Sequence, residues 1–279
     1  MSCPTVQELL QSGNDLPGDS ARRDAEILLG YCLSKPRSWL YTWPEREVPT
    51  ADADHFKQLL EQRRRGQPVA YLVGQREFWS LSLAVNRHTL IPRPETETLV
   101  SWALELTLPV NARVLDLGTG SGAIALALAS ERPGWQVQGI DTSEGALAVA
   151  RSNAVQLELE RVSFYQSNWY SAVLNQQFHL LAANPPYIDP LDSHLQQGDV
   201  RFEPASALVA AQAGMADIVE LVGGARAQLH PGGWLLLEHG FNQGEAVRGL
   251  LKRAGFSGIA TRSDLAGQER ISGGRISVE

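Results

Sequence analysis

Three glycines at alternate positions, within the stretch VLDLGTGSGAI at residues 114–124, are the residues of this chain best suited to bind a ligand. An apolar, β-branched run precedes them and a helix-forming stretch follows, so the sequence predicts a strand, a tight turn and a helix. Glycine tolerates positive φ and lets a ligand approach the backbone, and a helix start offers unpaired N–H groups. We therefore predict a cofactor-binding loop made of Gly118, Thr119, Gly120, Ser121 and Gly122.

The loop alone leaves the identity of the cofactor open. Gly118, Gly120 and Ala123 also satisfy the dinucleotide fingerprint G-x-G-x-x-G/A. Asp141, at the end of the next apolar run, does not decide the matter. A carboxylate about 20 residues after the loop holds the ribose of a nicotinamide cofactor or of S-adenosylmethionine equally well.

The motif Asn184-Pro185-Pro186-Tyr187, which directly follows another apolar run, narrows the choice. Ligands of open α/β sheets bind outside the carboxyl ends of the strands, and we expect this strand to neighbour the one that carries Asp116. Asn184 Oδ1 and the Pro185 carbonyl are two acceptors for a planar –NH2 group. Pro186 restricts the backbone, and Tyr187 offers a flat face for stacking. The motif favours chemistry on an amino nitrogen, while the alternative is a rigid turn after a buried strand.

Length, charge and cysteine content exclude several classes of protein. The chain has 279 residues with 43% hydrophobic content, enough for one large or two modest domains with a real core. Its net charge of −7 argues against a protein whose main task is to grip nucleic acid through phosphates. Cys3 and Cys32 give neither a disulfide framework nor metal-ligand spacing. No apolar run is long enough for a membrane span and no signal-peptide pattern is present, so we expect a cytoplasmic protein without a metal.

Residues 1–75 are predicted to form a small helical bundle. Apolar residues recur at helical spacing in three segments, at 5–11, 20–32 and 51–64. The bundle carries no catalytic constellation, so we favour a role in recognising a partner macromolecule. The run Arg63-Arg64-Arg65 is interpreted as the solvated end of the third helix, with a basic binding patch as the alternative.

The remainder of the chain is predicted to contain a hairpin linker at residues 76–94 and an α/β domain at residues 95–279. Alternating apolar residues around Phe78 and Leu83 indicate the hairpin, and His88 is assigned to a loop. The alternation of strands and helices beyond residue 95 predicts a parallel sheet with helices on both faces, closed by two final strands of which at least one is antiparallel. Strands are expected at 113–117, 136–141, 162–166, 178–183, 234–238, 258–262 and 269–277, with a turn at 231–233 and helices at 123–130, 143–156, 215–229 and 245–254.

Two further segments are predicted to border the same crevice. Trp169 follows the third strand, where an adenine ring would lie, and Asn168 Oδ1 is placed to accept from the adenine amine. The polar loop QGDVRFEP at residues 197–204 follows the Asn-Pro-Pro-Tyr motif. It is interpreted as a loop that folds over the substrate or as a plain surface loop.

The segments PVAYLVGQREFWSL, LIPRPETE, VLDLGTGSGAIALALA, ANPPYI and QGDVRFEP resemble those of the release-factor glutamine N5-methyltransferases. These bacterial enzymes methylate the glutamine of the Gly-Gly-Gln motif in class I peptide-chain release factors. The resemblance, which extends over nearly the whole chain, implies S-adenosyl-L-methionine as cofactor. It also implies a helical N-terminal domain that engages the release factor, a hairpin linker and a seven-stranded, Rossmann-like class I methyltransferase domain. We expect a monomer with no nucleic-acid substrate and no membrane partner.

The resemblance also assigns roles to single residues. It implies that Gly118 to Gly122 hold the methionine part of the cofactor, that Asp141 holds the ribose hydroxyls and that Trp169 lies beside the adenine. The segment from Asn184 to Tyr187 would hold the glutamine amide. Many relatives have Asp at the position of Asn168, so a charge-assisted bond to the adenine amine would become a neutral one in this chain.

The chemistry expected from these residues is a direct in-line displacement that relies on positioning and electrostatics. Two other substrates fit the same motif: a glutamine of a ribosomal protein, and an adenine N6 of nucleic acid on a flipped base. A cofactor-binding protein without turnover is a further alternative, which the intact Asn-Pro-Pro-Tyr motif argues against. A nicotinamide dehydrogenase is disfavoured because no His or Lys is expected near the crevice as hydride partner.

Overall fold

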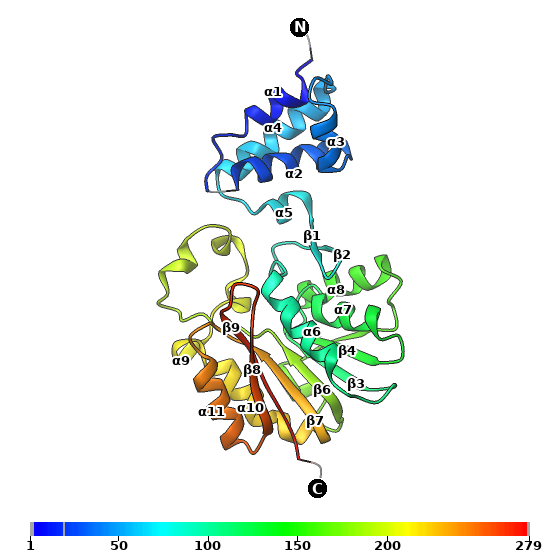
Figure 1. The fold of residues 1–279 in the computed structure, drawn as a ribbon, viewed down its shortest axis with the longest axis vertical. Coiled ribbons are helices and arrows are strands. Elements are labelled where there is room, and N and C mark those ends of the chain that lie inside the picture. Colours follow the sequence, from blue (N-terminus) through cyan, green and yellow to red (C-terminus); the bar gives the residue numbers. More distant parts are fainter. Residues whose placement is uncertain (1–2, 19, 278–279) are drawn as a thin grey trace. The chain divides into compact units, whose positions relative to one another are not determined.

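The computed structural model describes residues 3–18 and 20–277, which fall into two compact units (Figure 1). The first unit contains the described residues up to Gln75 together with Gln196–Phe202. The second unit contains Arg76–Leu195 and the chain from Glu203 onward. Among the described residues, no helix has the length and apolar character that crossing a membrane requires.

The first unit is a bundle of short helices around an apolar core. Phe56, Leu28 and Leu29 are fully buried in that core. The helices are α1 (Val6–Gln11), α2 (Ala21–Leu33), α3 (Arg37–Thr42), α4 (Thr50–Arg64) and α5 (Val69–Val73). The three predicted helices are therefore confirmed, to within a residue at each end. Helices α3 and α5 were not predicted; they have 6 and 5 residues and, unlike the similarly short α1, no side-chain cap at the N-terminus.

The interpretation of the three consecutive arginines as a solvated helix end is wrong for Arg63. This side chain is buried, with a residue exposure of only 9%. Its Nε donates to Asp24 Oδ2 at 2.8 Å, and its Nη1 donates to Asp199 Oδ1 at 2.7 Å. Arg64 pairs with Asp15 at 2.9 Å, and only Arg65 is largely exposed. The sequence gives no sign of this burial, because Asp24 and Asp199 are distant in the chain.

The second unit is built on a seven-stranded sheet (Figure 1). Seven strands were expected, whereas their order, β5-β4-β3-β6-β7-β9-β8, was predicted only in that β3 and β6 are neighbours. Strands β5, β4, β3, β6 and β7 are parallel, and β9 runs antiparallel to both of its neighbours. The strands are β3 (Arg113–Leu117), β4 (Gln136–Asp141), β5 (Ser163–Gln166), β6 (Phe178–Ala183), β7 (Leu229–Glu238), β8 (Ser257–Ser263) and β9 (Glu269–Arg275). The strand order reverses between β3 and β6, which is where open α/β sheets bind ligands.

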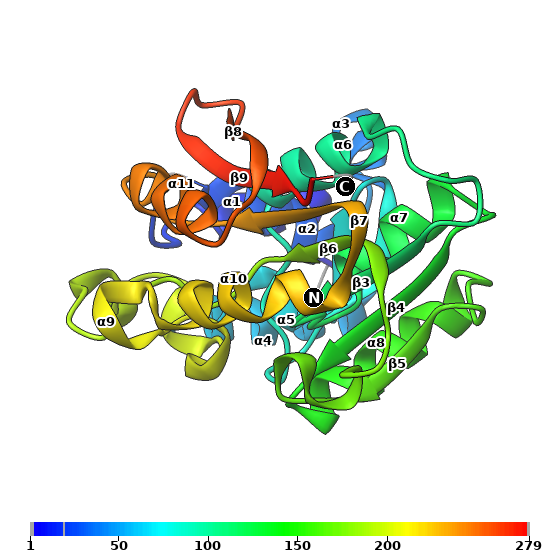
Figure 2. The ribbon, with the colours of Figure 1, turned by 90° about the horizontal axis from the view of Figure 1, so that it is seen from below.

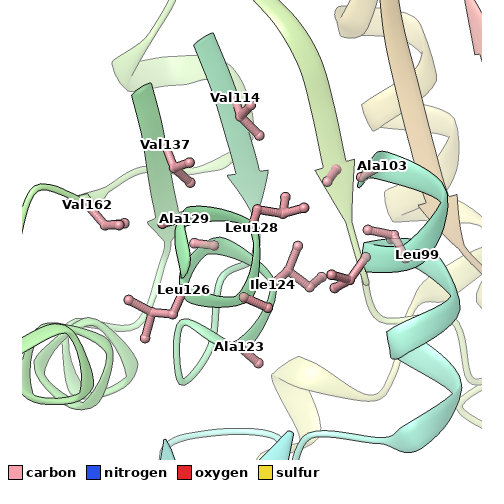
Figure 3. Close-up of a cluster of buried hydrophobic side chains, with 14 of the residues drawn as sticks. Leu99, Ala103, Val114, Ala123, Ile124, Leu126, Leu128, Ala129, Val137 and Val162 are labelled. Carbon is pink, nitrogen blue, oxygen red and sulfur yellow. The ribbon is translucent and has the colours of Figure 1, made fainter. Parts of the chain in front are cut away.

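Helices cover both faces of this sheet, which gives two apolar layers (Figure 2). One layer is formed with α6 (Glu97–Glu105), α7 (Ala123–Glu131) and α8 (Glu144–Gln156). The other is formed with α10 (Ala216–Gln228) and α11 (Gly244–Arg253). Residues 123–129 of α7 are all buried, as expected for a helix that is apolar all round. Figure 3 shows Ile124 and Leu128 of this helix beside Leu99 of α6 and Val114 of β3.

A hairpin and several short helices complete the structure. The predicted hairpin is formed by β1 (Gln75–Phe78) and β2 (Leu81–Ala84), and its turn residues Trp79 and Ser80 both have positive φ. Asn153 of α8 secures β2, since its side chain accepts from Ala84 N at 2.7 Å and donates to Ala84 O at 3.1 Å. The short helices are η1 (Pro94–Thr96), η2 (Trp169–Ala172), η3 (Ser193–Gln196), η4 (Val200–Phe202), η5 (Ala205–Ala207) and α9 (Ala211–Gly214).

The prediction of a turn at residues 231–233 is wrong. Strand β7 already begins at Leu229 and passes through this segment, with a shift in its pairing register to β6. Gly232 has a φ of +79° and donates its N–H to Ile276 O at 3.0 Å. The Pro-Gly-Gly segment is therefore an irregularity within a strand, a place where glycine is often found.

Candidate active site

The glycine loop and the Asn-Pro-Pro-Tyr motif start side by side at the carboxyl ends of two paired strands. Leu117, the last residue of β3, pairs in parallel with Ala183, the last residue of β6. This pairing confirms the predicted neighbourhood of the two strands. A cavity of about 320 Å³ lies there, with Gly118, Gly120 and Asn184 in its wall. Its volume falls within the range of small-molecule sites, roughly 300–1,000 Å³.

The glycine loop depends on backbone conformations that other residues rarely adopt. Gly118, Gly120 and Gly122 have φ values of +76°, +56° and +85°. A Cβ on Gly118 would lie 3.5 Å from the Trp169 ring, whereas a Cβ on Gly120 would meet no atom within 4 Å. The space beside Gly120 is therefore open for a ligand. Gly122 is the N-cap of α7, and Ala123 of its first turn lines the same cavity.

Two carboxylates, from the adjoining strands β3 and β4, form hydrogen bonds with residues of this loop. Asp141 Oδ2 accepts from Gly120 N at 2.9 Å and Oδ1 accepts from Ser143 N at 2.9 Å, while burial raises the pKa of Asp141. Asp116 accepts from Thr119 Oγ1 at 2.6 Å. Complete burial raises the pKa of Asp116 to about 7, and the nearby Asp141 charge acts in the same direction. Asp116 Oδ1 has no hydrogen-bond partner in the part of the chain that the structure describes.

The segment after β5 forms another part of the cavity wall. Asn168 and Trp169 both line the cavity, and Trp169 has a φ of +43°, which is unusual for a bulky residue. The Trp169 ring packs against Gly118. Asp217 lines the cavity too and was missed by the sequence analysis. Burial raises the pKa of Asp217, although a hydrogen bond with the Trp169 side chain acts in the opposite direction.

The four residues of the Asn-Pro-Pro-Tyr motif are placed differently. Asn184 and Pro186 line the cavity, whereas Pro185 is buried. Asn184 Nδ2 donates to Thr96 Oγ1 at 3.1 Å. The Tyr187 hydroxyl donates to Glu238 Oε1 at 3.1 Å, and burial, together with the Glu238 charge, raises the pKa of Tyr187. Thr96 and Glu238, which lie outside the motif, therefore hold its first and last residues by hydrogen bonds.

Thr96 and Glu238 are two site residues that the sequence analysis did not identify. The Thr96 hydroxyl donates to Glu238 Oε2 at 2.7 Å, and the two residues are only 4% and 1% exposed. Burial raises the pKa of Glu238 to about 7, against the hydrogen bonds from Thr96 and Tyr187. The position of Glu238 at the end of the apolar run Leu235-Leu236-Leu237 was a usable signal, because Asn184 ends its strand in the same way. We find no such signal for Thr96.

Pro204, the last residue of the loop at residues 197–204, and His88 also belong to the cavity wall. Gln197 to Phe202 belong to the first unit, whereas Glu203 and Pro204 belong to the second. Glu203 is buried, accepts from Ile91 N at 2.9 Å and pairs with Arg93, and Pro204 lines the cavity. His88 lies in a loop, as predicted, and it also lines the cavity. Across residues 3–18 and 20–277, no three His, Cys, Asp or Glu side chains are grouped to hold a metal ion.

Family models match both parts of the chain, and solved structures match a large share of it. Residues 6–74 match a model described as the PrmC N-terminal domain, and residues 96–220 match a model described as the methyltransferase small domain. A methyltransferase from Pyrococcus furiosus is 18% identical, with a TM-score of 0.54 over 71% of this chain and 90% of that one. The hMettl16 catalytic domain is 15% identical, with a TM-score of 0.56 over 72% of this chain and 77% of its own. Both structures support the methyltransferase fold.

Curated relatives show the family. The release factor glutamine methyltransferase of Shewanella oneidensis is 52% identical over 92% of this chain and 90% of its own. That of Pseudomonas aeruginosa is 51% identical over 97% of this chain and 98% of its own. That of Escherichia coli is 49% identical over 92% and 93%. At this identity and coverage, the chain belongs to the family of release factor glutamine methyltransferases, which are S-adenosylmethionine-dependent enzymes.

Proposed function

We propose that this enzyme methylates the side-chain amide nitrogen, N5, of the glutamine in the Gly-Gly-Gln motif of class I peptide-chain release factors. The observation that carries the proposal is the orientation of Asn184 beside the glycine loop. Its Nδ2 is bonded to Thr96, which leaves Oδ1 as an acceptor for a substrate amide. The names of the relatives support the substrate class.

The residues that line the cavity support S-adenosyl-L-methionine as its cofactor, since they include the glycine loop and Asp141. When bound, this cofactor supplies an electrophilic methyl group on a sulfonium centre. Gly118, Thr119, Gly120, Ser121 and Gly122 would hold its methionine part, because the Cβ position of Gly120 is open. Asp141 would hold the ribose hydroxyls. A carboxylate has about four lone-pair sites, and the two backbone N–H groups bonded to Asp141 leave sites for this. Trp169 would lie beside the adenine.

The residues of the Asn-Pro-Pro-Tyr motif would orient the substrate. Asn184 Oδ1 and the Pro185 carbonyl accept the two hydrogens of the glutamine amide, while Pro186 and Tyr187 fix the geometry of these acceptors. The nitrogen lone pair, which is delocalised and weakly nucleophilic, is thereby directed toward the methyl group. The bound cofactor would supply the methyl group to this nitrogen, which would then lose one proton to water. Positioning and electrostatics supply the rate enhancement, so no buried general base is needed.

The proposal also assigns substrate recognition and methyl transfer to different parts of the chain. A glutamine side chain offers few contacts, so specificity requires a larger surface of the release factor to be read. We assign this to the helical residues 1–75, with residues 76–94 as linker and residues 95–279 as the methyltransferase domain. The enzyme is proposed to act as a monomer in the cytoplasm.

Labelled S-adenosyl-L-methionine tests the substrate assignment. Purified class I release factor is incubated with the enzyme, beside a release-factor variant in which the Gly-Gly-Gln glutamine is replaced by alanine. Label is expected on the first protein alone. A short Gly-Gly-Gln peptide should react with a much lower kcat/KM than the intact factor. Preferential labelling of ribosomal proteins or of nucleic acid, offered in parallel, would favour one of the alternative substrates instead.

A further inference from the structure

We propose that Thr96 and Glu238 fix the orientation of the Asn184 side-chain amide, so that its oxygen and not its nitrogen is presented to the substrate. The two are positioning residues, since they act through Asn184. The inference rests on the function proposed above and extends it to residues outside the Asn-Pro-Pro-Tyr motif. It depends on the order of donors and acceptors along one buried chain of hydrogen bonds.

Glu238, the buried end of this series of hydrogen bonds, decides which groups donate and which accept. A threonine hydroxyl has one proton to donate. Thr96 donates it to Glu238 Oε2 at 2.7 Å, so Thr96 Oγ1 is left as an acceptor. Asn184 Nδ2 donates to that oxygen at 3.1 Å. The nitrogen of Asn184 is thereby held against Thr96, which turns its oxygen away from Thr96.

Glu238 is well placed to anchor the motif because it ends the neighbouring strand. Ala183 of β6 pairs with Leu237 of β7, so Asn184 and Glu238 follow paired residues. The Tyr187 hydroxyl donates to the second oxygen, Glu238 Oε1, at 3.1 Å. One buried carboxylate therefore accepts from both Thr96 and Tyr187. It supports the first residue of the motif through Thr96 and the last residue directly.

The wrong orientation would be costly for the proposed reaction. The oxygen and the NH2 group of an asparagine amide have nearly the same shape, so packing alone distinguishes them poorly. A rotated Asn184 would place its NH2 group opposite the NH2 group of the substrate glutamine. Two donors would then face each other, and the substrate nitrogen would lose one of its two orienting acceptors. Thr96 and Glu238 prevent this arrangement by bonding the Asn184 nitrogen.

A matched pair of variants isolates the hydroxyl of Thr96. Thr96→Val keeps the branched shape and removes the hydroxyl, whereas Thr96→Ser keeps the hydroxyl and removes the methyl group. We expect Thr96→Val to lower kcat on intact release factor by about tenfold or more, the scale of loss typical for misplaced reacting groups. Cofactor Kd, measured by calorimetry, should stay within about twofold because the glycine loop is untouched. Thr96→Ser should recover most of the lost kcat.

Glu238→Gln is the second variant, since it keeps the size of the side chain. Its amide NH2 can donate to Thr96, which frees the Thr96 proton for Asn184 Oδ1 and favours the rotated amide. We expect the same loss of kcat with the same unchanged cofactor Kd. Thermal unfolding of every variant establishes that the folded protein is being compared.

Nuclear magnetic resonance tests the orientation without any assay of activity. In the wild-type protein, the side-chain NH2 protons of Asn184 should show nuclear Overhauser contacts to the Thr96 methyl group. Absence of these contacts would overturn the inference whatever the substrate is. So would a Thr96→Val variant with wild-type kcat, or a Thr96→Ser variant as slow as Thr96→Val. Failure of the wild-type enzyme to methylate release factor would instead contradict the proposed function, and the resonance contacts would still decide the orientation.

Discussion

The glycine loop and the Asn-Pro-Pro-Tyr motif occupy the ends of two adjacent strands, yet they are built in opposite ways. The loop uses residues with the most backbone freedom, and its three glycines all have positive φ. The motif uses the most restricted residue, proline, and its polar side chains are held by Thr96 and Glu238. We infer that the loop provides space for the cofactor, whereas the motif provides direction for the substrate. The two should fail in different ways when they are changed.

The largest expected effect is on the motif. Asn184→Ala should lower kcat by about 10²–10³, the usual loss when one preorganised polar group is removed from a site of this kind. Cofactor affinity should change little, because the glycine loop and Asp141 remain. Steady-state kinetics on intact release factor and calorimetry with the cofactor measure the two quantities. A variant with kcat within about tenfold of wild type would remove Asn184 from its proposed role.

Two alanine substitutions in the glycine loop should act on cofactor binding and on stability, where Asn184→Ala acts on kcat. Gly120→Ala puts a Cβ into open space, so we expect cofactor Kd to rise by about tenfold, or about 1.4 kcal/mol. Gly122→Ala brings its Cβ to 3.0 Å from Leu126 Cδ1 and 3.3 Å from Ala150 Cβ. Positive φ strains alanine at both positions, by about 1–2 kcal/mol. Crowding should add about 1–3 kcal/mol for Gly122→Ala alone.

Calorimetry and urea unfolding distinguish these two variants. Both variants should lose stability, Gly122→Ala by the larger amount, whereas the loss of cofactor affinity is expected for Gly120→Ala. If Gly120→Ala bound the cofactor as tightly as the wild-type enzyme, the open space beside Gly120 would not be the binding site.

The smallest effect on kcat is expected from a change of pH, which alters the protonation of Glu238, the residue that supports the Asn-Pro-Pro-Tyr motif. Burial raises the pKa of Glu238 to about 7, opposed by Thr96, Tyr187 and the charge of Arg270 and reinforced by the charge of Glu95. Only the ionised carboxylate is a pure acceptor for Thr96 and Tyr187. Therefore kcat should fall a few-fold as the pH drops through about 7, and it should recover as the pH rises.

Asp116 provides the control for this titration, because burial raises its pKa to about 7 as well. The inflection in the pH profile of kcat should vanish in Glu238→Gln and persist in Asp116→Asn. The reverse outcome would assign the titration to Asp116, beside the glycine loop, and not to Glu238.

The same contrast explains what the sequence could predict. The strand, turn and helix around Gly118 are encoded by neighbouring residues, and the parallel sheet with helices on both faces followed from the alternation of strands and helices. The orientation of Asn184 depends on Thr96 and Glu238, which lie far away in the chain. Donor and acceptor roles across such distances arise only when the strands pair, so no local pattern reveals them.

In the first unit too, contacts between residues far apart in the sequence could not be predicted. Helices α2 and α4 were predicted from their periodicity, but the burial of Arg63 was not, because one of its partners, Asp199, lies in the separate segment Gln196–Phe202. His88 lies in a loop, as predicted, but its place in the cavity wall could not be predicted, for a related reason. Its ring lies against Gly145, where an added Cβ would come within 2.8 Å of it, and the sequence does not indicate this contact.

Direct observation of the substrate nitrogen tests the central claim, that the motif orients a glutamine amide for methylation at N5. Release factor carrying ¹⁵N in its glutamine side chains is incubated with the enzyme and ¹³C-methyl S-adenosyl-L-methionine. The account predicts that the paired N–H signals of the Gly-Gly-Gln side-chain amide give way to a single N–H signal coupled to the ¹³C-methyl group, and that Asn184→Ala slows this conversion by about 10²–10³. Persistence of the paired signals while ¹³C-methyl appears elsewhere on the factor would contradict it.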